Sequence, residues 1–310
     1  MRRVFGIGET VYDILFRNGK PVDAVAGGSV FNGLISLGRT GADCTFITEI
    51  GDDAVGQHIL SFMKENGIDS SSVSCYKGRK TAISLAYLDD SGDAHYSFYK
   101  DYPNNRLEFS LPEIHKDDIV MFGAYYALNP VLQDKVGPFL EYARNCGAIL
   151  YYDLNFRSNH CSEVDSLRDT FTRNYRLADI VRGSHEDLMN IYGTDDFRRI
   201  YRECISPYCS HFICTRGSQG VFVLDGENEH SFKSRVIEPV STVGAGDNFN
   251  AGIVYGLLKQ EAGRDKLEQA DAQVWESLAS CGIDFGTEAC LSTSNYVGMQ
   301  FAQEHRLERK

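Results

Sequence analysis

The sequence is organised around one stretch, Ser241-Thr242-Val243-Gly244-Ala245-Gly246-Asp247-Asn248-Phe249-Asn250-Ala251-Gly252. Three small residues in a row, Gly244 to Gly246, let backbone N–H groups approach an anion closely. Apolar side chains then recur every four residues, which predicts a helix from about Gly246. Because a helix N-terminus carries partial positive charge and unpaired N–H donors, this turn is suited to bind phosphate.

Asp247 falls in the first turn of that predicted helix and has two interpretations. A carboxylate in this place could accept a proton from a substrate hydroxyl. It could equally do no more than stabilise the start of a helix after a glycine turn. The rest of the chain has to decide between the two.

Apolar strand patterns alternate with helix patterns along most of the chain, and this predicts an α/β fold with a mostly parallel sheet and helices on both faces. The segment 79–103 differs, because it contains strand, Asp/Gly turn and strand signals that are typical of a hairpin. With part of 11–25 it predicts a small β-sheet that stands off the main body. Without an internal repeat or a linker, we expect a single domain over 1–310, with a lid formed by about 11–25 and 79–103.

Composition limits the classes of partner. The formal charge of −12 argues against a general nucleic-acid binder, since phosphate contacts need clustered Lys and Arg. No run approaches the ~20 apolar residues of a membrane span, and the N-terminal residues lack the apolar stretch of a signal peptide. Nine cysteines are scattered without a C-x-x-C pair, so we expect a reducing cytoplasm, no membrane and no nucleic acid. Three of the cysteines lie close together in the sequence near His211, but their spacing fits no common zinc site: Cys204, Cys209 and Cys214.

Polar or glycine-rich clusters fall at or near the ends of several predicted strands, where an open parallel sheet binds its ligands. They are Asp13, Gly27-Gly28, Asp153-Leu154-Asn155-Phe156-Arg157, Thr215 to Gly220, and Gly244 to Asp247. The P-loop, the dinucleotide-binding fingerprint, the protein-kinase signatures and the hydrolase elbow are absent. The 215–220 loop still offers a hydroxyl and two glycines, either as a cradle for nucleotide phosphates or as an ordinary hairpin turn.

Taken together, these motifs resemble the ribokinase-like carbohydrate kinase family, also called the PfkB family. Ala26 to Asn32, with Gly38 and Gly51 to Gly56, resembles its N-terminal signature, and Ser241 to Asp247 resembles its C-terminal signature, usually D-T-x-G-A-G-D. Thr215 to Gly220 is similar to the T-x-G-x-x-G loop of the family. The segment 153–157 is similar to the family's D-x-N-x-R motif. The resemblance implies a ribokinase-like three-layer αβα domain with a mostly parallel central sheet and a small β-sheet lid.

The resemblance also implies roles. Asp247 would be the general base, and the N–H groups of Gly244, Ala245 and Gly246 would form an anion hole for the transferring phosphoryl group. The sugar would contact Asp13, Gly28, Asn32 and Arg157, although an Arg beside an Asp could also be a structural ion pair. ATP would contact Thr215, Gly217, Gly220 and Ser184, while the lid would exclude water.

Two departures from the family pattern bear on cations. Ser241 replaces an Asp that supports a monovalent cation in many relatives, so dependence on K⁺ is in doubt. The family's N-x-x-E motif, which organises Mg²⁺, is here Ser184-His185-Glu186-Asp187. Asp187 is the expected Mg²⁺ ligand, directly or through water, with Glu186 as a substitute.

The acceptor is expected to be a small carbohydrate phosphorylated on a primary hydroxyl, with fructose first, because Gly8 to Asp13 is similar to the opening of fructokinases. Ser97-Phe98-Tyr99-Lys100 resembles a stretch found in both fructokinases and 2-keto-3-deoxygluconate kinases. A sugar phosphate would need a basic cluster near the lid, where Arg79, Lys80, Lys100 and Arg106 are available. Alternatives are 2-keto-3-deoxygluconate, ribose, a nucleoside or a sugar phosphate, or a catalytically silent sugar-binding homologue. Pairing of lids in a homodimer is a further expectation by resemblance.

Overall fold

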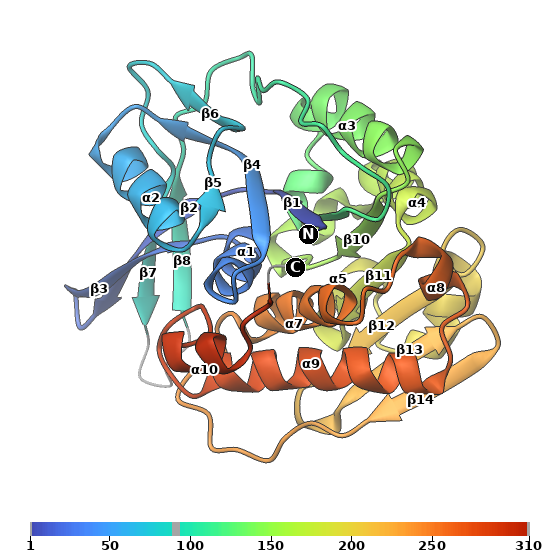
Figure 1. The fold of residues 1–310 in the computed structure, drawn as a ribbon. Coiled ribbons are helices and arrows are strands. Elements are labelled where there is room, and N and C mark those ends of the chain that lie inside the picture. Colours follow the sequence, from blue (N-terminus) through green and yellow to red (C-terminus); the bar gives the residue numbers. More distant parts are fainter. Residues whose placement is uncertain (1, 89–93, 309–310) are drawn as a thin grey trace.

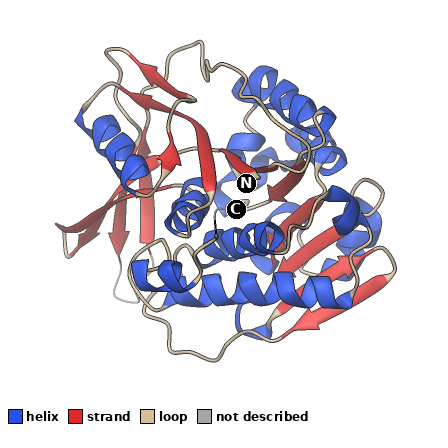
Figure 2. Ribbon diagram, viewed as in Figure 1, coloured by secondary structure: helices blue, strands red, loops and turns tan. Residues whose placement is uncertain are grey.

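The central sheet is built from short apolar strands whose side chains alternate between two buried faces. The computed structural model describes residues 2–88 and 94–308, and its large sheet lies between layers of helices (Figure 1, Figure 2). In the strand that follows residue 118, Ile119 and Met121 join one hydrophobic cluster while Val120 and Phe122 join the other. Because both faces are covered, the strands are continuously hydrophobic, as parallel strands usually are.

The ten-stranded sheet has the order β14-β13-β12-β11-β10-β9-β1-β4-β5, and β6 pairs with β4. Pairing is parallel from β5 to β12, and β13 and β14 are antiparallel additions at one edge. The strands are β1 (Arg3–Ile7), β4 (Asp43–Gly51), β5 (Ile68–Asp69), β6 (Val73–Tyr76), β9 (Ile119–Gly123), β10 (Ile149–Asp153), β11 (Ile180–Ser184), β12 (His211–Thr215), β13 (Val221–Asp225) and β14 (Asn228–Phe232).

Helices cover both faces of the sheet, which confirms the predicted three-layer arrangement. One cluster of core residues takes in side chains of α1 (Ser29–Arg39), α2 (Ala54–Glu65), α7 (Ala245–Lys259), α8 (Arg264–Glu268), α9 (Ala272–Cys290) and α10 (Met299–Glu304). The other takes in side chains of α3 (Gln133–Asn145), α4 (Val164–Leu177), α5 (His185–Tyr192) and α6 (Phe197–Ile200). Short 3₁₀ segments lie at 125–127, 130–132, 158–163 and 217–219, and a π turn at 201–205.

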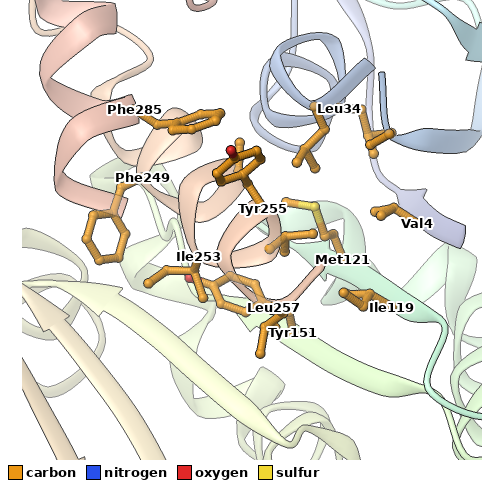
Figure 3. Close-up of a cluster of buried hydrophobic side chains, with 14 of the residues drawn as sticks. Val4, Leu34, Ile119, Met121, Tyr151, Phe249, Ile253, Tyr255, Leu257 and Phe285 are labelled. Atoms are coloured by element: carbon orange, nitrogen blue, oxygen red, sulfur yellow. The ribbon is translucent and has the colours of Figure 1, made fainter. Parts of the chain in front are cut away.

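Helix α7, which begins at the glycine turn, is buried along most of its length. Its side chains lie among those of α1, β1, β9, β10 and α9 (Figure 3). Gly252 allows α7 to approach α9 closely, because a Cβ there would lie 2.3 Å from the carbonyl oxygen of Cys281. The helix that carries the first-turn acid is therefore fixed from both sides, and its N-terminus is a rigid part of the fold.

A separate four-stranded sheet forms the predicted lid, with the order β3-β2-β7-β8. Its strands are β2 (Val11–Arg17), β3 (Lys20–Gly27), β7 (Ile83–Leu88) and β8 (Ala94–Tyr99). The predicted turn at 89–92 lies outside the described residues. Asp13, which the sequence placed with the strand-end clusters of the main body, lies within lid strand β2, paired with Val25 and Ser84. Among the described residues, no helix combines the length and the apolar character needed to cross a membrane.

Candidate active site

The glycine turn holds the N-terminus of α7 in a strained backbone conformation that only glycine tolerates well. Gly244 has a φ of 78°, and a Cβ there would lie 2.9 Å from the carbonyl oxygen of Asn295. The Asn248 amide donates to the carbonyls of Gly244 (2.8 Å) and Asn295 (2.9 Å), which fixes the turn from behind. The predicted helix start near Gly246 is confirmed to within one residue.

Two of the three N–H groups that were predicted to form an anion hole have no protein acceptor. Within the described part of the chain, the N–H groups of Gly244 and Gly246 make no hydrogen bond, whereas that of Ala245 donates to the Thr242 carbonyl at 3.3 Å. The first N–H groups of a helix have no intrahelical partner, so an anion is a suitable partner for them. The turn therefore offers two open donors and a third held by a long bond.

Asp247 lies in the first turn of α7 and is bound to the neighbouring helix. The Asn32 side-chain amide of α1 donates to its Oδ2 at 2.8 Å. The pKa of Asp247 is raised to about 6, chiefly by burial and also by the charge of Asp153. The Asn32 hydrogen bond and the charges of Arg157 and Arg182 lower that pKa. At neutral pH such a carboxyl is mostly ionised and still basic enough to accept a proton.

On the acceptor side, a second glycine places backbone and carboxylate close together. Gly28 has a φ of 131°, and a Cβ there would lie 2.2 Å from the carbonyl oxygen of Glu9, so no side chain fits. Asp13 accepts a hydrogen bond from Ser84, and its other oxygen lies 2.8 Å from where a Cβ of Gly27 would be. The pKa of Asp13 is raised to about 6, chiefly by burial; the Ser84 hydrogen bond lowers this pKa and the Glu9 charge raises it.

Arg157 follows β10 and is exposed. It makes no ion pair in the described chain, so the alternative of a structural ion pair finds no support. Its charge lowers the pKa of Asp247, so the guanidinium lies close enough to act on that acid. The structure thus associates Arg157, Asn32 and Asp247.

The 215–220 loop is a hairpin connection between β12 and β13, and its glycines adopt unusual conformations. Gly217 has a φ of 54° and Gly220 a φ of 104°, and a Cβ on Gly220 would lie 2.3 Å from the Phe232 carbonyl oxygen. The Arg216 side chain bonds to Asp195 at 2.6 Å and so fixes the loop against the segment after α5. The hairpin interpretation and the phosphate-cradle interpretation are compatible with this one geometry.

The segment from Ser184 to Asp187 forms a capping box at the start of α5. Ser184 accepts from the Asp187 N–H, and Asp187 Oδ2 accepts from both the Ser184 N–H (2.6 Å) and the Ser184 hydroxyl (2.8 Å). Asp187 Oδ1 accepts from the Phe156 N–H at 2.7 Å. Both oxygens are therefore occupied by protein donors, and the expectation that Asp187 binds a metal competes with a role in folding.

Glu186 is exposed and borders a hollow of about 380 Å³, which is lined by Ser158, His185, Glu186, Met189, Asn190 and Asp195. Asp195 joins this hollow to the 215–220 loop through its ion pair with Arg216. No group of three or more His, Cys, Asp or Glu side chains that could hold a metal ion is present among the described residues.

A buried polar network that the sequence interpretation did not include lies behind the glycine turn. Arg182 of β11 donates to Asp153 Oδ1 at 3.0 Å and to the Thr215 hydroxyl at 2.6 Å. Asn250 of α7 donates to the other oxygen of Asp153 at 2.8 Å. The sequence contains one signal of this network, which is the charged residue Arg182 inside an otherwise apolar strand pattern at 180–184. Arg182 also lies against the first turn of α7, because a Cβ on Gly246 would lie 3.0 Å from its Nη2. Since Arg182 contacts both Thr215 and this turn, the two glycine turns lie at the same end of the sheet.

Comparison with known proteins identifies a family of enzymes that this chain matches. A family model described as "pfkB family carbohydrate kinase" matches residues 1–273. A fructokinase of Klebsiella pneumoniae is 28% identical over 265 residues, which cover 82% of this chain and 84% of that protein.

Solved structures of two proteins share the fold. The fructokinase of Vibrio cholerae O395, solved with fructose, ADP and a calcium ion, and as a double mutant with potassium, is 20% identical with a TM-score of 0.82 over 99% of both chains. The aminoimidazole riboside kinase of Salmonella enterica, solved with aminoimidazole riboside and an ATP analogue, is 20% identical with a TM-score of 0.80 over 98% of both chains.

Proposed function

We propose that the acceptor of this enzyme is a neutral sugar, with fructose as the first candidate. The chain belongs to the pfkB family of carbohydrate kinases and therefore transfers a phosphoryl group from ATP to a sugar hydroxyl. The observation that carries the proposal is the pairing of the cations near the lid. A charged acceptor would need unpaired positive charge at the far end of the acceptor site, because a phosphate or carboxylate is held best by Arg and Lys.

Three of the four cations that could form such a cluster are bonded to carboxylates. Arg79 pairs with Asp101 at 3.0 Å, Lys100 with Glu9 at 2.5 Å, and Arg106 with the buried Glu49. The Glu49 pair is the most firmly held, because Tyr76 also donates to Glu49 at 2.7 Å and the Arg106 guanidinium stacks on the Tyr102 ring at 3.7 Å. These cations are not free to bind an anionic sugar.

In the proposed reaction, Asp247 accepts the proton of the sugar hydroxyl as that oxygen attacks the γ-phosphate of ATP. The open N–H groups of Gly244 and Gly246 receive the charge of the transferring phosphoryl group, and Ala245 joins them if its bond to Thr242 opens. Asn32 orients Asp247 and, with Asp13 and the backbone at Gly28, holds sugar hydroxyls. Arg157, whose charge lowers the pKa of Asp247, would lie near the sugar or the transferring phosphoryl group.

On the nucleotide side, we propose that ATP lies along the 215–220 loop, against Thr215, Gly217 and Gly220, with Ser184 at the end of β11. A divalent cation, Mg²⁺ with ATP, would neutralise phosphate charge there; such an ion is commonly held by one or two carboxylates, phosphate oxygens and water. The exposed Glu186 fits that role directly, while Asp187 fits it only through water or after its cap bonds open.

Dependence on K⁺ is proposed to be weak. The Ser241 hydroxyl accepts from the Val243 N–H at 3.2 Å, and a hydroxyl supplies no charge to a monovalent cation. Equal rates in KCl and NaCl would support this proposal.

The test is a panel of acceptors with ATP, Mg²⁺ and coupled detection of ADP. The panel contains fructose, ribose, adenosine, 2-keto-3-deoxygluconate and fructose 6-phosphate, and Asp247→Asn is the inactive control. We expect the highest kcat/KM with fructose. Higher kcat/KM with the sugar acid or the sugar phosphate would contradict the proposal of a neutral acceptor.

A matched variant sharpens the panel. Glu9→Gln releases Lys100 from its carboxylate, so we expect activity with the two anionic acceptors to rise relative to fructose. Asp101→Gln, which releases Arg79 at the exposed outer pair, serves as the control and is expected to change the ratio little. A rise with both variants would show that overall charge, and not the position of the cation, decides the preference.

We also propose a homodimer formed through the lid. Large apolar side chains are exposed on its strands, including Val22 on β3 and Tyr99 on β8, which are 55% and 56% exposed. Both are edge strands of the lid sheet, and an open edge with apolar side chains favours pairing with a second copy. Sedimentation of the wild-type chain and of Tyr99→Lys would test it, with a monomer expected for the variant.

A further inference from the structure

The Asp153–Arg182 ion pair stands at the junction of four elements that the proposed reaction needs. Asp153 ends β10, Arg182 lies in β11, Thr215 ends β12, and Asn250 lies in the second turn of α7. The side chains of the two charged residues are 6% and 7% exposed. A buried ion pair stabilises a fold only weakly, because the cost of desolvating the two charges offsets their attraction. Stability alone therefore does not explain an ion pair at this junction.

The hydrogen bonds of the pair lead in two directions. On one side, Arg182 donates to the Thr215 hydroxyl at 2.6 Å, at the start of the loop proposed to bind ATP. On the other, Asn250 donates to Asp153 at 2.8 Å and itself accepts from the Tyr151 hydroxyl at 2.8 Å. The pair thus joins the ATP loop to the helix that carries the anion hole and Asp247.

The guanidinium also lies directly against the glycine turn. A Cβ on Gly246 would be 3.0 Å from Arg182 Nη2 and 3.2 Å from Nη1, closer than nearly all real Cβ contacts. The remaining nitrogen, Nε, is buried without a hydrogen-bond partner. A positive charge that is not fully compensated by hydrogen bonds is therefore placed behind the backbone where the transferring phosphoryl group would lie.

We infer that Asp153 and Arg182 are positioning residues for phosphoryl transfer: together they hold the 244–246 turn in register with the 215–220 loop and set the charge behind Asp247. The inference rests on the proposed function. The pair touches neither ATP nor sugar in the proposed arrangement, and it acts through Thr215, Gly246 and Asp247. The two charges act on Asp247 in opposite directions, because Asp153 raises the pKa of that carboxyl while Arg182 lowers it.

Removing either charge of the pair is expected to shift the pKa of Asp247, and the two shifts are opposite in sign. A merely structural role would not produce opposite shifts. Arg182→Met removes a positive charge, so the pKa of Asp247 should rise by about 1. Asp153→Asn removes a negative charge, so that pKa should fall by a similar amount. Arg182→Lys keeps the charge but loses the fork that reaches Asp153 and Thr215 together, so the pKa should stay while turnover falls about ten-fold.

The measurement is a ¹³C-carboxyl NMR titration of Asp247 in the ligand-free protein, with the resonance assigned by Asp247→Asn, followed by pH profiles of kcat/KM. The matched controls are Arg264→Met and Asp179→Asn, from another ion pair, 3.0 Å long, between the start of α8 and the residue before β11. These controls are expected to lower thermal stability and to leave the titration unchanged. If Arg182→Met does not fold, Asp153→Asn and Arg182→Lys carry the test.

Shifts in the same direction for Arg182→Met and Asp153→Asn, or no shift beyond the controls, would overturn the inference. The titration needs no substrate, so it separates this inference from the proposed function. A wild-type chain that releases no ADP with any sugar would end the proposed function while the titration still decides the role of the pair. A wild-type chain that is active, with variants that change stability only, would end the inference alone.

Discussion

Two carboxyl groups, one at the start of α7 and one on the lid sheet, have the same pKa of about 6 and very different surroundings. Burial is the main cause of the increase for both. Asp247 accepts from the Asn32 amide and lies near Arg157 and Arg182, whereas Asp13 accepts from the Ser84 hydroxyl and lies near another acid, Glu9. A raised pKa alone therefore does not identify a catalytic base.

The difference lies in what surrounds the acid. Beside Asp247 there are open backbone N–H groups at Gly244 and Gly246 and two cations, so negative charge can arrive there and be stabilised. Asp13 faces a second acid and lies in a lid strand, where charge on a phosphoryl group would be repelled. One acid is suited to take a proton during transfer, and the other to hold a hydroxyl.

The largest effect is expected for Asp247→Asn, which keeps the Asn32 hydrogen bond and removes the basic oxygen. The kcat with the best sugar should fall by at least about 1,000-fold, because general-base catalysis and the geometry it fixes are both lost. Coupled ADP detection measures kcat, and titration calorimetry checks that ATP and sugar still bind. Near-normal turnover would place the base elsewhere.

Asp13→Asn should act on binding. Loss of a charged acceptor for a sugar hydroxyl costs about 1.5–3 kcal/mol, so the KM for sugar should rise by roughly 10- to 100-fold while kcat changes less. Asp23→Asn, an exposed acid of the same sheet, is the control and should behave as wild type. If Asp13→Asn instead lowers kcat as much as Asp247→Asn does, the distinction between the two acids fails.

Asn32→Ala separates the two acids by pH. The Asn32 hydrogen bond lowers the pKa of Asp247, so its loss raises that pKa, and the acid limb of kcat, measured with saturating sugar, moves to higher pH. At pH 6 the variant should lose about ten-fold more kcat than at pH 8. Ser84→Ala removes the corresponding bond of Asp13 and should leave the acid limb of kcat in place, with an increase in KM only. An unmoved limb in Asn32→Ala would show that Asp247 does not control it.

The sequence alone predicted the α/β fold, the lid and the glycine turns, because strand periodicity and glycine turns are local signals. The helix start after Gly244 and the loop from Thr215 to Gly220 follow from backbone preferences of a few neighbouring residues. What could not be predicted depends on residues distant in the chain. The Asp153–Arg182 pair needs β10 and β11 side by side, and the bond from the Phe156 N–H to Asp187 needs two loops to meet.

One further signal was present in the sequence and given a different interpretation. Ser184 and Asp187 are three residues apart before an apolar run, which is the spacing of a capping box. The same spacing matched a metal-binding motif, and only the hydrogen bonds of both Asp187 oxygens show how strongly the cap competes for that carboxylate. Local patterns of this kind specify the residues of a site but not which of two partners each residue takes.

The smallest expected effect concerns stability, which depends on a property that the two acids share, a pKa raised by burial. For Asp13 the folded-state pKa of about 6 exceeds the ordinary aspartate value of 3.8, so the folded state holds the proton more tightly than the unfolded state. That contribution stabilises the fold below about pH 4 and is lost as the pH rises through about 6. Asp13→Asn should therefore raise Tm at pH 8, by a few degrees for about 1 kcal/mol in a chain of this size, and the gain should vanish toward pH 4. Asp23→Asn, scanned by calorimetry beside it, should show no such pH dependence. A gain in Tm that persists at pH 4 would mean that the amide packs better than the carboxyl in either protonation state. In that case the burial of a charged carboxylate at Asp13 does not lower the stability of the fold.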